Sequence, residues 1–325
     1  MFMRYVPDKT NLGFMRLRIP SFLLSVAAIG LSIFLIMTQG LNLGIDFRGG
    51  SVIETTKPAG VEVENIRGTI LDLDFNGAEI TEARGTGVDA AQVFVVKIPT
   101  QDAEEGENPE AVQQQATDLI ANTLTETYSG LEVRGRETVG PKVSGELLTA
   151  GVTALAVALA LMMIYISFRF KWHYALGAVT ALVHDVILTI GVFAGLQLEF
   201  NLSTIAALLT IVGYSMNDTV VVFDRVREEA RKYKQMPSRE LIDLSLNGTL
   251  SRTLLTSGTT LLALLAIFIL GGPVLRGMSF ALIWGVIVGT YSSIFVASSL
   301  LLALPEEGWR RTAKKPEVEG FQPTA

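Results

Sequence analysis

Residues 147–168 of the chain read LLTAGVTALAVALALMMIYISF, and residues 278–304 read MSFALIWGVIVGTYSSIFVASSLLLAL. Neither stretch contains a charged side chain. Because the hydrocarbon core of a bilayer is about 30 Å thick, a helix of roughly 20 apolar residues can cross it. Both stretches reach that length, so the sequence predicts an integral membrane protein.

Four more apolar stretches bring the predicted transmembrane helices to six, at residues 19–37, 147–168, 175–198, 202–223, 253–270 and 278–304. The composition agrees, since 49% of the 325 residues are apolar and only 18% are charged, against about a quarter in soluble domains. Arg16 and Arg18 precede the first span, as in a secretion signal, but no small-residue cleavage site follows it. This span, extended to residue 40, is therefore interpreted as an uncleaved anchor.

Basic residues set the predicted orientation, because loops rich in Lys and Arg stay on the inner side of a membrane. With the N-terminus inside, 17 of the 26 basic residues lie on the inner side, and the short outer loops contain only Arg276. Both termini are therefore expected inside. The predicted parts are a cytoplasmic segment (1–18), an outer domain (41–146), a membrane region (147–304) with a cytoplasmic loop (224–252), and a cytoplasmic tail (305–325).

The outer segment contains 19 acidic and 8 basic residues and has a regular pattern. Alternating apolar residues predict strands at 51–56, 78–83, 92–98 and 131–138, and helical spacing predicts helices at 61–73 and 110–128. The order βαββαβ indicates a ferredoxin-like fold. The expected fold class is an α-helical membrane protein with six transmembrane helices, plus an α+β ferredoxin-like domain outside the membrane.

The composition argues against several kinds of site. The chain has no cysteine and two histidines, so neither a disulfide framework nor an ordinary metal site is expected. The chain has no Gly-Lys pair and hence no Walker A loop. The sequence also shows no pairing of a nucleophile with a base that would suggest a hydrolase. Residues 85–90 mimic a dinucleotide fingerprint without a following helix, and residues 72–83 mimic a calcium loop with Ala83 in place of the required Glu. We interpret both as turns.

Ionisable side chains inside the predicted spans mark the candidate functional site, because a charge at mid-bilayer costs a few kcal/mol or more. His184 and Asp185 lie near the middle of the third span. Asn217 and Asp218 lie in the fourth, with Asp218 about 9 Å from the predicted inner end of that span. Arg252 begins the fifth span. We predict Asp218, Arg252, Asn217 and Asp185 as proton-transfer residues.

The physical basis is that low dielectric favours a neutral carboxyl group, whereas a nearby arginine favours the carboxylate. Asp218 between these influences could take a proton from one side and release it to the other when Arg252 moves. A polar stripe could support a water chain beside them; it consists of Tyr214, Thr256, Thr259 and Thr260. The alternatives are that Asp218 and Arg252 reach the inner surface, that Asp185 makes only a structural hydrogen bond, and that His184 only packs.

The sixth span has a small residue at every fourth position, and such a ridge lets another helix approach closely. The ridge consists of Gly277, Ala281, Gly285, Gly289, Ser293 and Ala297. Its partner helix is expected either in this chain or in another. On the inner side, residues 238–250 predict an amphipathic helix along the membrane surface, with Leu241, Leu244 and Leu246 on its apolar face.

Four motifs resemble those of the SecD/SecF family of export proteins: GIDFRGG at 44–50, VGPKVSGEL at 139–147, VGYSMNDTVVVFDRVRE at 212–228 and LSRTLLTS at 250–257. The resemblance runs from about residue 14 to residue 305. In the first motif, Gly44, Asp46, Gly49 and Gly50 are the candidate motif residues, and a turn into the outer domain is favoured over a substrate contact. Because the sequence ends after six spans, it resembles the stand-alone SecF form and not a fused SecDF.

The resemblance implies a membrane fold of the resistance–nodulation–division type in the inner (plasma) membrane, with SecD supplying six further spans. It also implies work beside the SecYEG channel, where the outer domains would pull an unfolded preprotein outward using the proton-motive force. YajC and membrane lipid are further expected partners, and nucleic acid is not. The family's transmembrane aspartate falls on Asp218 and its arginine on Arg252. No cofactor is expected apart from protons as the coupling ion, and the chain is expected not to be an enzyme.

Two other functions stay open from the sequence. A non-conducting scaffold would only assemble SecD with the channel, and its polar stripe would tolerate apolar replacement. Half of a small-molecule/proton antiporter would need a ligand-lined cavity in the outer region, for which the acidic domain offers no evident candidate.

Overall fold

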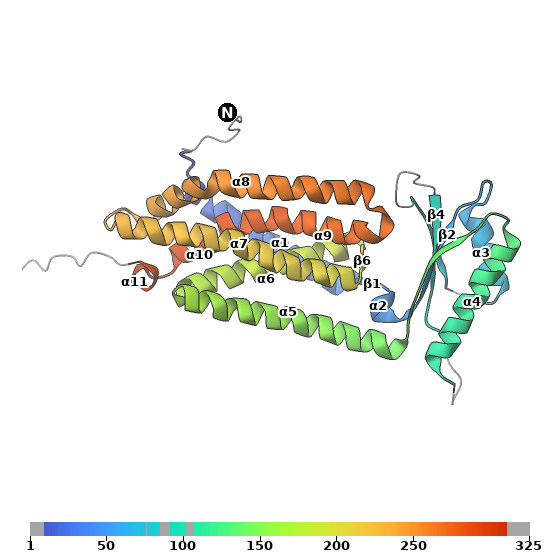
Figure 1. Cartoon of the computed structure of the whole chain (residues 1–325). Coiled ribbons are helices and arrows are strands. Elements are labelled where there is room, and N and C mark those ends of the chain that lie inside the picture. The colour runs from blue at the N-terminus through green and yellow to red at the C-terminus, as the bar shows by residue number, and fades with distance from the viewer. Residues whose placement is uncertain (1–9, 76, 85–91, 102–106, 311–325) are drawn as a thin grey trace, which may run out of the picture.

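The computed structural model describes residues 10–75, 77–84, 92–101 and 107–310. Figure 1 shows a long helical bundle with a small α/β domain at one end. The dinucleotide look-alike at 85–90, the tail after residue 310 and the start of the basic leader lie outside the described residues.

Within the described residues, six helical spans are long and apolar enough to cross a membrane, as the sequence predicts. They are α1 (Arg18–Gln39), α5 (Pro141–Arg169), α6 (Trp172–Leu196), α7 (Leu202–Lys232), α8 (Ser238–Leu270) and a sixth built from α9 (Gly272–Ser292), the π turn η2 (Ser293–Ala297) and α10 (Ser298–Ala303). A short helix, α11 (Glu306–Trp309), follows. Helices α6 and α7 form the buried centre of the bundle, whereas α5 is almost entirely exposed.

Helices α7 and α8 extend beyond the predicted spans, so most of the predicted loop at 224–252 is helical. The prediction of a separate surface helix at 238–250 is wrong, because these residues are the first turns of α8. Leu241 and Leu246 are buried in the bundle core, whereas Leu244 is 40% exposed. Burial against neighbouring helices thus replaces the expected contact of the apolar face with headgroups.

The α/β domain consists of β2 (Gly50–Thr56), α3 (Val63–Asp72), β3 (Glu79–Arg84), β4 (Gln92–Ile98), α4 (Pro109–Thr127) and β5 (Val133–Val139). Its sheet has the order β3-β4-β2-β5, and every strand pair is antiparallel. The predicted βαββαβ order is therefore confirmed. Ile53 of β2, Phe94 of β4 and Ile120 of α4 are fully buried in the core between the sheet and the helices.

Local hydrogen bonds define the ends of these elements. The Asn108 side chain accepts a hydrogen bond from the N–H of Glu110 at 3.0 Å and so caps α4. After β2, the Lys57 ammonium group lies 2.7 Å from Glu82 of β3 and 3.3 Å from Glu62, which caps α3. The hydrogen bond to Glu82 raises the pKa of Lys57. This ammonium group thus links a sheet edge to the helix above it.

A small joint, formed by β1 (Asn42–Leu43), α2 (Ile45–Arg48) and β6 (Glu199–Phe200), connects the α/β domain to the bundle. Strands β1 and β6 pair in parallel. The Asp46 carboxylate of α2 accepts a hydrogen bond at 2.8 Å from the N–H of Leu202, the first residue of α7. Lys97 of β4 forms an ion pair with Glu199 of β6. The start of α7 is therefore bonded to the joint through Asp46, and β6 just before it is attached to the outer domain by an ion pair.

The glycine pair at residues 49 and 50 turns the chain from the joint into β2. Gly49 and Gly50 have φ angles of 76° and 120°, a region that side chains other than glycine rarely adopt. A Cβ atom on Gly50 would also clash with the carbonyl oxygen of Ile98. This geometry favours the turn over a direct substrate contact.

Candidate functional site

Asp218 of α7 has a hydroxyl donor for each of its carboxylate oxygens. Thr253 of α8 donates to Oδ1 and Ser293 of the π turn donates to Oδ2, both at 2.7 Å. The Asp218 side chain is partly buried, and both donors are buried. Three spans therefore meet at this one carboxyl group.

Asp185 of α6 is fully buried and has three polar neighbours. Ser215 of α7 and Ser292 of α9 donate to its Oδ2 at 2.6 and 2.8 Å. Nδ1 of His184 lies 2.9 Å from its Oδ1. Nε2 of His184 is buried and has no hydrogen-bond partner among the described residues. Asp185 and His184 thus form a buried polar pair next to the Asp218 site.

The adjacent residues Ser292 and Ser293 connect the two carboxyl groups. Consecutive residues of an α-helix point about 100° apart, so one serine contacts Asp185 on α6 and the next contacts Asp218 on α7. The regular helix ends here, because residues 293–297 form the π turn. Such turns are rare and occur frequently at functional sites. One short segment therefore contacts both acidic groups.

More hydroxyl groups lie one helical turn nearer the outer domain. Tyr214 donates to Ser257 at 3.3 Å, and the Ser257 hydroxyl lies 2.8 Å from that of Thr290. Tyr214 precedes Asp218 by one turn, and Ser257 follows Thr253 by one turn. The hydroxyls of α7, α8 and α9 thus continue from Asp218 towards the outer end.

The other predicted proton-transfer residues do not contact the Asp218 carboxyl group in the structure. Arg252 immediately precedes Thr253, but its side chain is exposed, and no described acidic group lies within 4.0 Å of it. Asn217 is exposed as well. The threonines of the predicted stripe donate to carbonyl groups of their own helix instead; they are Thr256, Thr259 and Thr260. Thr253 and Ser257 are the α8 hydroxyls that face the site.

Sequence reasoning missed Ser215, Thr253 and Ser292 as ligands of the carboxyl groups, and it assigned Ser293 to helix packing alone. One signal was present in the sequence, since a Ser-Ser pair stands where the ridge otherwise has glycine or alanine. The structure gives Ser293 a hydrogen bond to Asp218 in addition to its place in the ridge.

The small-residue ridge packs within this chain, against α7. A Cβ atom on Gly285 would clash with Ile211, and one on Gly289 would lie 3.0 Å from Cβ of Ser215. The close approach of α9 to α7 brings Ser292 and Ser293 within hydrogen-bond distance of the two carboxyl groups.

Two family signatures match the chain. Residues 119–307 match "Protein export membrane protein SecD/SecF, C-terminal", and residues 34–56 match "SecD/SecF GG Motif". The first match spans more than half of the chain. The chain belongs to the SecD/SecF family. The resemblance seen in the sequence motifs is therefore confirmed, and the glycine pair of the joint lies within the second signature.

SecD/SecF relatives align with almost the whole chain. The protein translocase subunit SecF of Rhodobacter capsulatus is 46% identical over 321 residues, which cover 98% of this chain and 96% of the relative. The translocase subunit SecDF of Brucella abortus is 40% identical over 302 residues, covering 92% of this chain and 38% of that longer relative. The crystal structure of SecDF from Thermus thermophilus has a TM-score of 0.76 and 36% identity, covering 93% of this chain and 39% of that one.

These relatives establish the class of protein. The chain is a multi-pass inner-membrane protein and a transport component of the protein translocase. SecDF relatives contain the counterpart of this chain within a longer chain.

Proposed function

We propose that this chain, together with SecD, uses the proton-motive force to pull unfolded preproteins outward through the SecYEG channel, with YajC as a further partner. In this proposal both termini are cytoplasmic and the α/β domain lies outside the membrane. The observation that carries the proposal is the Asp218 carboxyl group inside the bundle, bonded to hydroxyls from two other spans. Protons are the proposed coupling ion.

A change of protonation at Asp218 has a direct structural consequence. A carboxylate only accepts hydrogen bonds, whereas a neutral carboxyl group also donates one. Thr253 and Ser293 both donate to Asp218. When Asp218 takes up a proton, the oxygen that carries it becomes a donor and a poorer acceptor, so its bond to Thr253 or Ser293 weakens or reverses its direction. Protonation thus changes the contact of α7 with α8 or with the π turn.

Movement of α7 has a route to the outer domain. Asp46 accepts a hydrogen bond from Leu202 at the N-terminal end of α7, and β6 just before it pairs with β1 and contacts Lys97 through Glu199. A shift of α7 that follows protonation of Asp218 would therefore move the joint, and the α/β domain with it.

We also propose that SecD completes the site. Asn217 of α7 and Arg252 of α8 are exposed on the surface of this chain, and they directly precede Asp218 and its donor Thr253. Polar and charged groups in the hydrocarbon region usually face other helices or a water-filled cavity, not lipid. The spans of SecD would cover this side and would place Arg252 at the interface between the two subunits.

The test is Asp218→Asn in the complex with SecD, reconstituted into vesicles. Asparagine keeps the shape of the side chain and can still accept from Thr253 or Ser293, but it does not take up a proton. We expect proton flux and preprotein export to fall at least about tenfold, while co-purification with SecD is unchanged.

Asp224→Asn is the matched control, because Asp224 lies on the same helix, is exposed and pairs with Arg169 at 3.5 Å. This control should export normally. Full export by Asp218→Asn would reject proton coupling and leave the scaffold function.

A further inference from the structure

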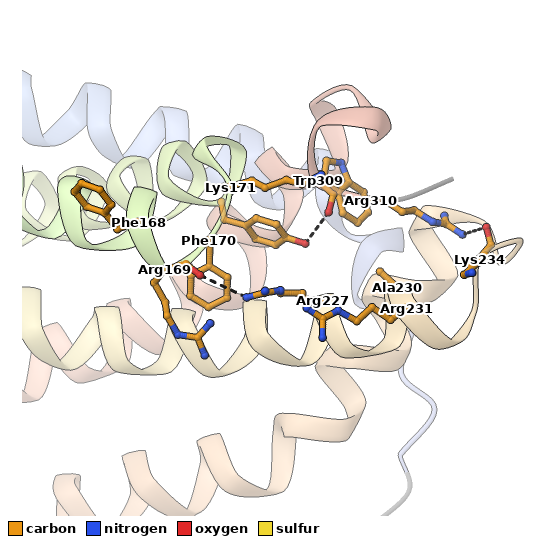
Figure 2. Close-up of a pocket in the computed structure, with 11 residues that line it drawn as sticks. Phe168, Arg169, Phe170, Lys171, Arg227, Ala230, Arg231, Lys234, Trp309 and Arg310 are labelled. Atoms are coloured by element: carbon orange, nitrogen blue, oxygen red, sulfur yellow. Dashed lines mark hydrogen bonds between the residues drawn. The ribbon is translucent and has the colours of Figure 1, made fainter. Parts of the chain in front are cut away.

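A basic cavity of about 670 Å³ lies at the end of the bundle opposite the α/β domain, between α5, α6, α7 and α11. Figure 2 shows basic side chains around it, from α5, from α7 and from the segments that precede α6, follow α7 and follow α11. They are Arg169, Lys171, Arg227, Arg231, Lys234 and Arg310. No acidic residue lines the cavity within the described part of the chain. The cavity therefore gathers positive charge that its own lining does not balance.

Most of these basic groups have no ion-pair partner among the described residues. Lys171, Arg231 and Lys234 make no side-chain ion pair there. Arg227 lies over the ring of Phe170, at 5.8 Å from its centre, and donates to the carbonyl of Arg169 at 3.4 Å. Like charges gathered in one cavity repel each other, and a bound anion would relieve that repulsion.

Arg310 supplies an independent observation, because its side chain is 3% exposed. Its guanidinium donates to the Ser238 hydroxyl at 3.0 Å and to the carbonyls of Tyr233 and Lys234 at 3.0 and 2.9 Å. Glu306 lies 3.8 Å away and is half-exposed. Nε of Arg310 is buried with no hydrogen-bond partner in the described structure. A buried N–H group without an acceptor is costly, so Arg310, a residue of the cavity lining, has an unsatisfied donor.

The position of the cavity indicates the kind of anion. Phe168, at one edge, is 88% exposed, and the neighbouring Trp172 is 60% exposed. Exposed aromatic residues at the end of transmembrane helices typically lie at the level of the headgroups. In the proposed orientation this end is at the inner leaflet, where basic pockets between helices bind anionic headgroups. We propose that the cavity binds the phosphate of an anionic phospholipid headgroup.

The test compares lipid retained by the complex with SecD after purification in micelles that contain phosphatidylglycerol or phosphatidylcholine, counted by native mass spectrometry. The variant Arg227→Gln/Arg231→Gln removes two charges from the cavity. The control Lys232→Gln/Arg239→Gln removes two charges from exposed residues at the same end, outside the cavity. We expect the first variant to retain about tenfold less phosphatidylglycerol, at roughly a factor of several per basic residue, and the control to retain nearly the native amount.

Three results of this comparison would overturn the proposal. They are equal loss of phosphatidylglycerol from both variants, which would indicate general surface charge, no loss from either variant, and retention of phosphatidylcholine by the native complex equal to that of phosphatidylglycerol.

A second experiment distinguishes a lipid headgroup from free phosphate. Phe168→Ala should lower lipid retention without changing the binding of inorganic phosphate. Binding of inorganic phosphate to the native complex without retained phosphatidylglycerol would reject a lipid site.

Discussion

At the scale of single residues, Asp218 depends on hydroxyl groups from other spans. Depth and charge along the sequence indicate this aspartate, but its donors Thr253 and Ser293 are 35 and 75 residues away. Helical spacing that starts from Arg252 predicts Thr256, Thr259 and Thr260 as the polar stripe instead, and these threonines donate to carbonyl groups of α8 itself. Thr253, which contacts Asp218, follows Arg252 by one residue and therefore lies about 100° around the helix from it. Packing sets which of these sides faces Asp218.

Removal of a donor should therefore impair the site, whereas removal of an exposed threonine hydroxyl should not. Hydrogen bonds to a charged group contribute about 1.5–3 kcal/mol. We expect Ser293→Ala or Thr253→Val to lower proton flux roughly tenfold or more in reconstituted vesicles. Thr259→Val removes a hydroxyl that donates only to carbonyl groups of its own helix. If Thr259→Val were the more damaging change, the predicted stripe and not the inner hydroxyls would be the functional group.

At the scale of elements, the close packing of α9 on α7 builds the site. The glycines of the ridge leave no side chains that would separate these helices. The last residue of α9 and the first residue of the π turn are consecutive serines, and each contacts one of the two carboxyl groups. Periodicity predicts such a ridge but not its partner helix. It also does not predict where a helix departs from regular geometry, because that departure depends on contacts with other elements.

A larger side chain in the ridge should separate these helices. Gly285→Val would overlap with Ile211, and overpacking of this kind destabilises proteins by about 1–3 kcal/mol. We expect a lower thermal midpoint for the detergent-solubilised chain, with reduced proton flux. Gly277→Val is the control on the same helix, because no atom lies within 4 Å of a Cβ atom there. Equal destabilisation by the two changes would show that the ridge does not pack tightly on α7.

At the scale of the whole molecule, the joint connects the α/β domain to the helix that carries Asp218. Asp46 lies just after the first span, whereas its partner Leu202 begins the fourth helix of the bundle, 156 residues later. One end of α7 therefore contacts the outer domain, and Asp218 lies on the same helix. The joint is consequently expected to transmit movement.

Loss of the Asp46 hydrogen bond should lower export without lowering proton flux. Asn201 remains the N-cap of α7, so Asp46→Ala should leave the complex folded. We expect preprotein export to fall several-fold while proton flux stays near the native level. Asp72→Ala, at an exposed carboxyl group of the α/β domain, is the control. Export at the native rate by Asp46→Ala would show that this hydrogen bond does not transmit the movement.

The sequence by itself determined the six spans, the βαββαβ order of the outer domain and the positions of Asp185 and Asp218, because these features depend on local hydropathy, on periodicity and on charge placed where lipid disfavours it. Only the tertiary structure decided which hydroxyls bind the carboxyl groups, that residues 238–250 continue into α8, and that basic residues from two helices and three connecting segments surround one cavity. These features depend on the rotation and contact of helices far apart in the chain, and no local pattern specifies them.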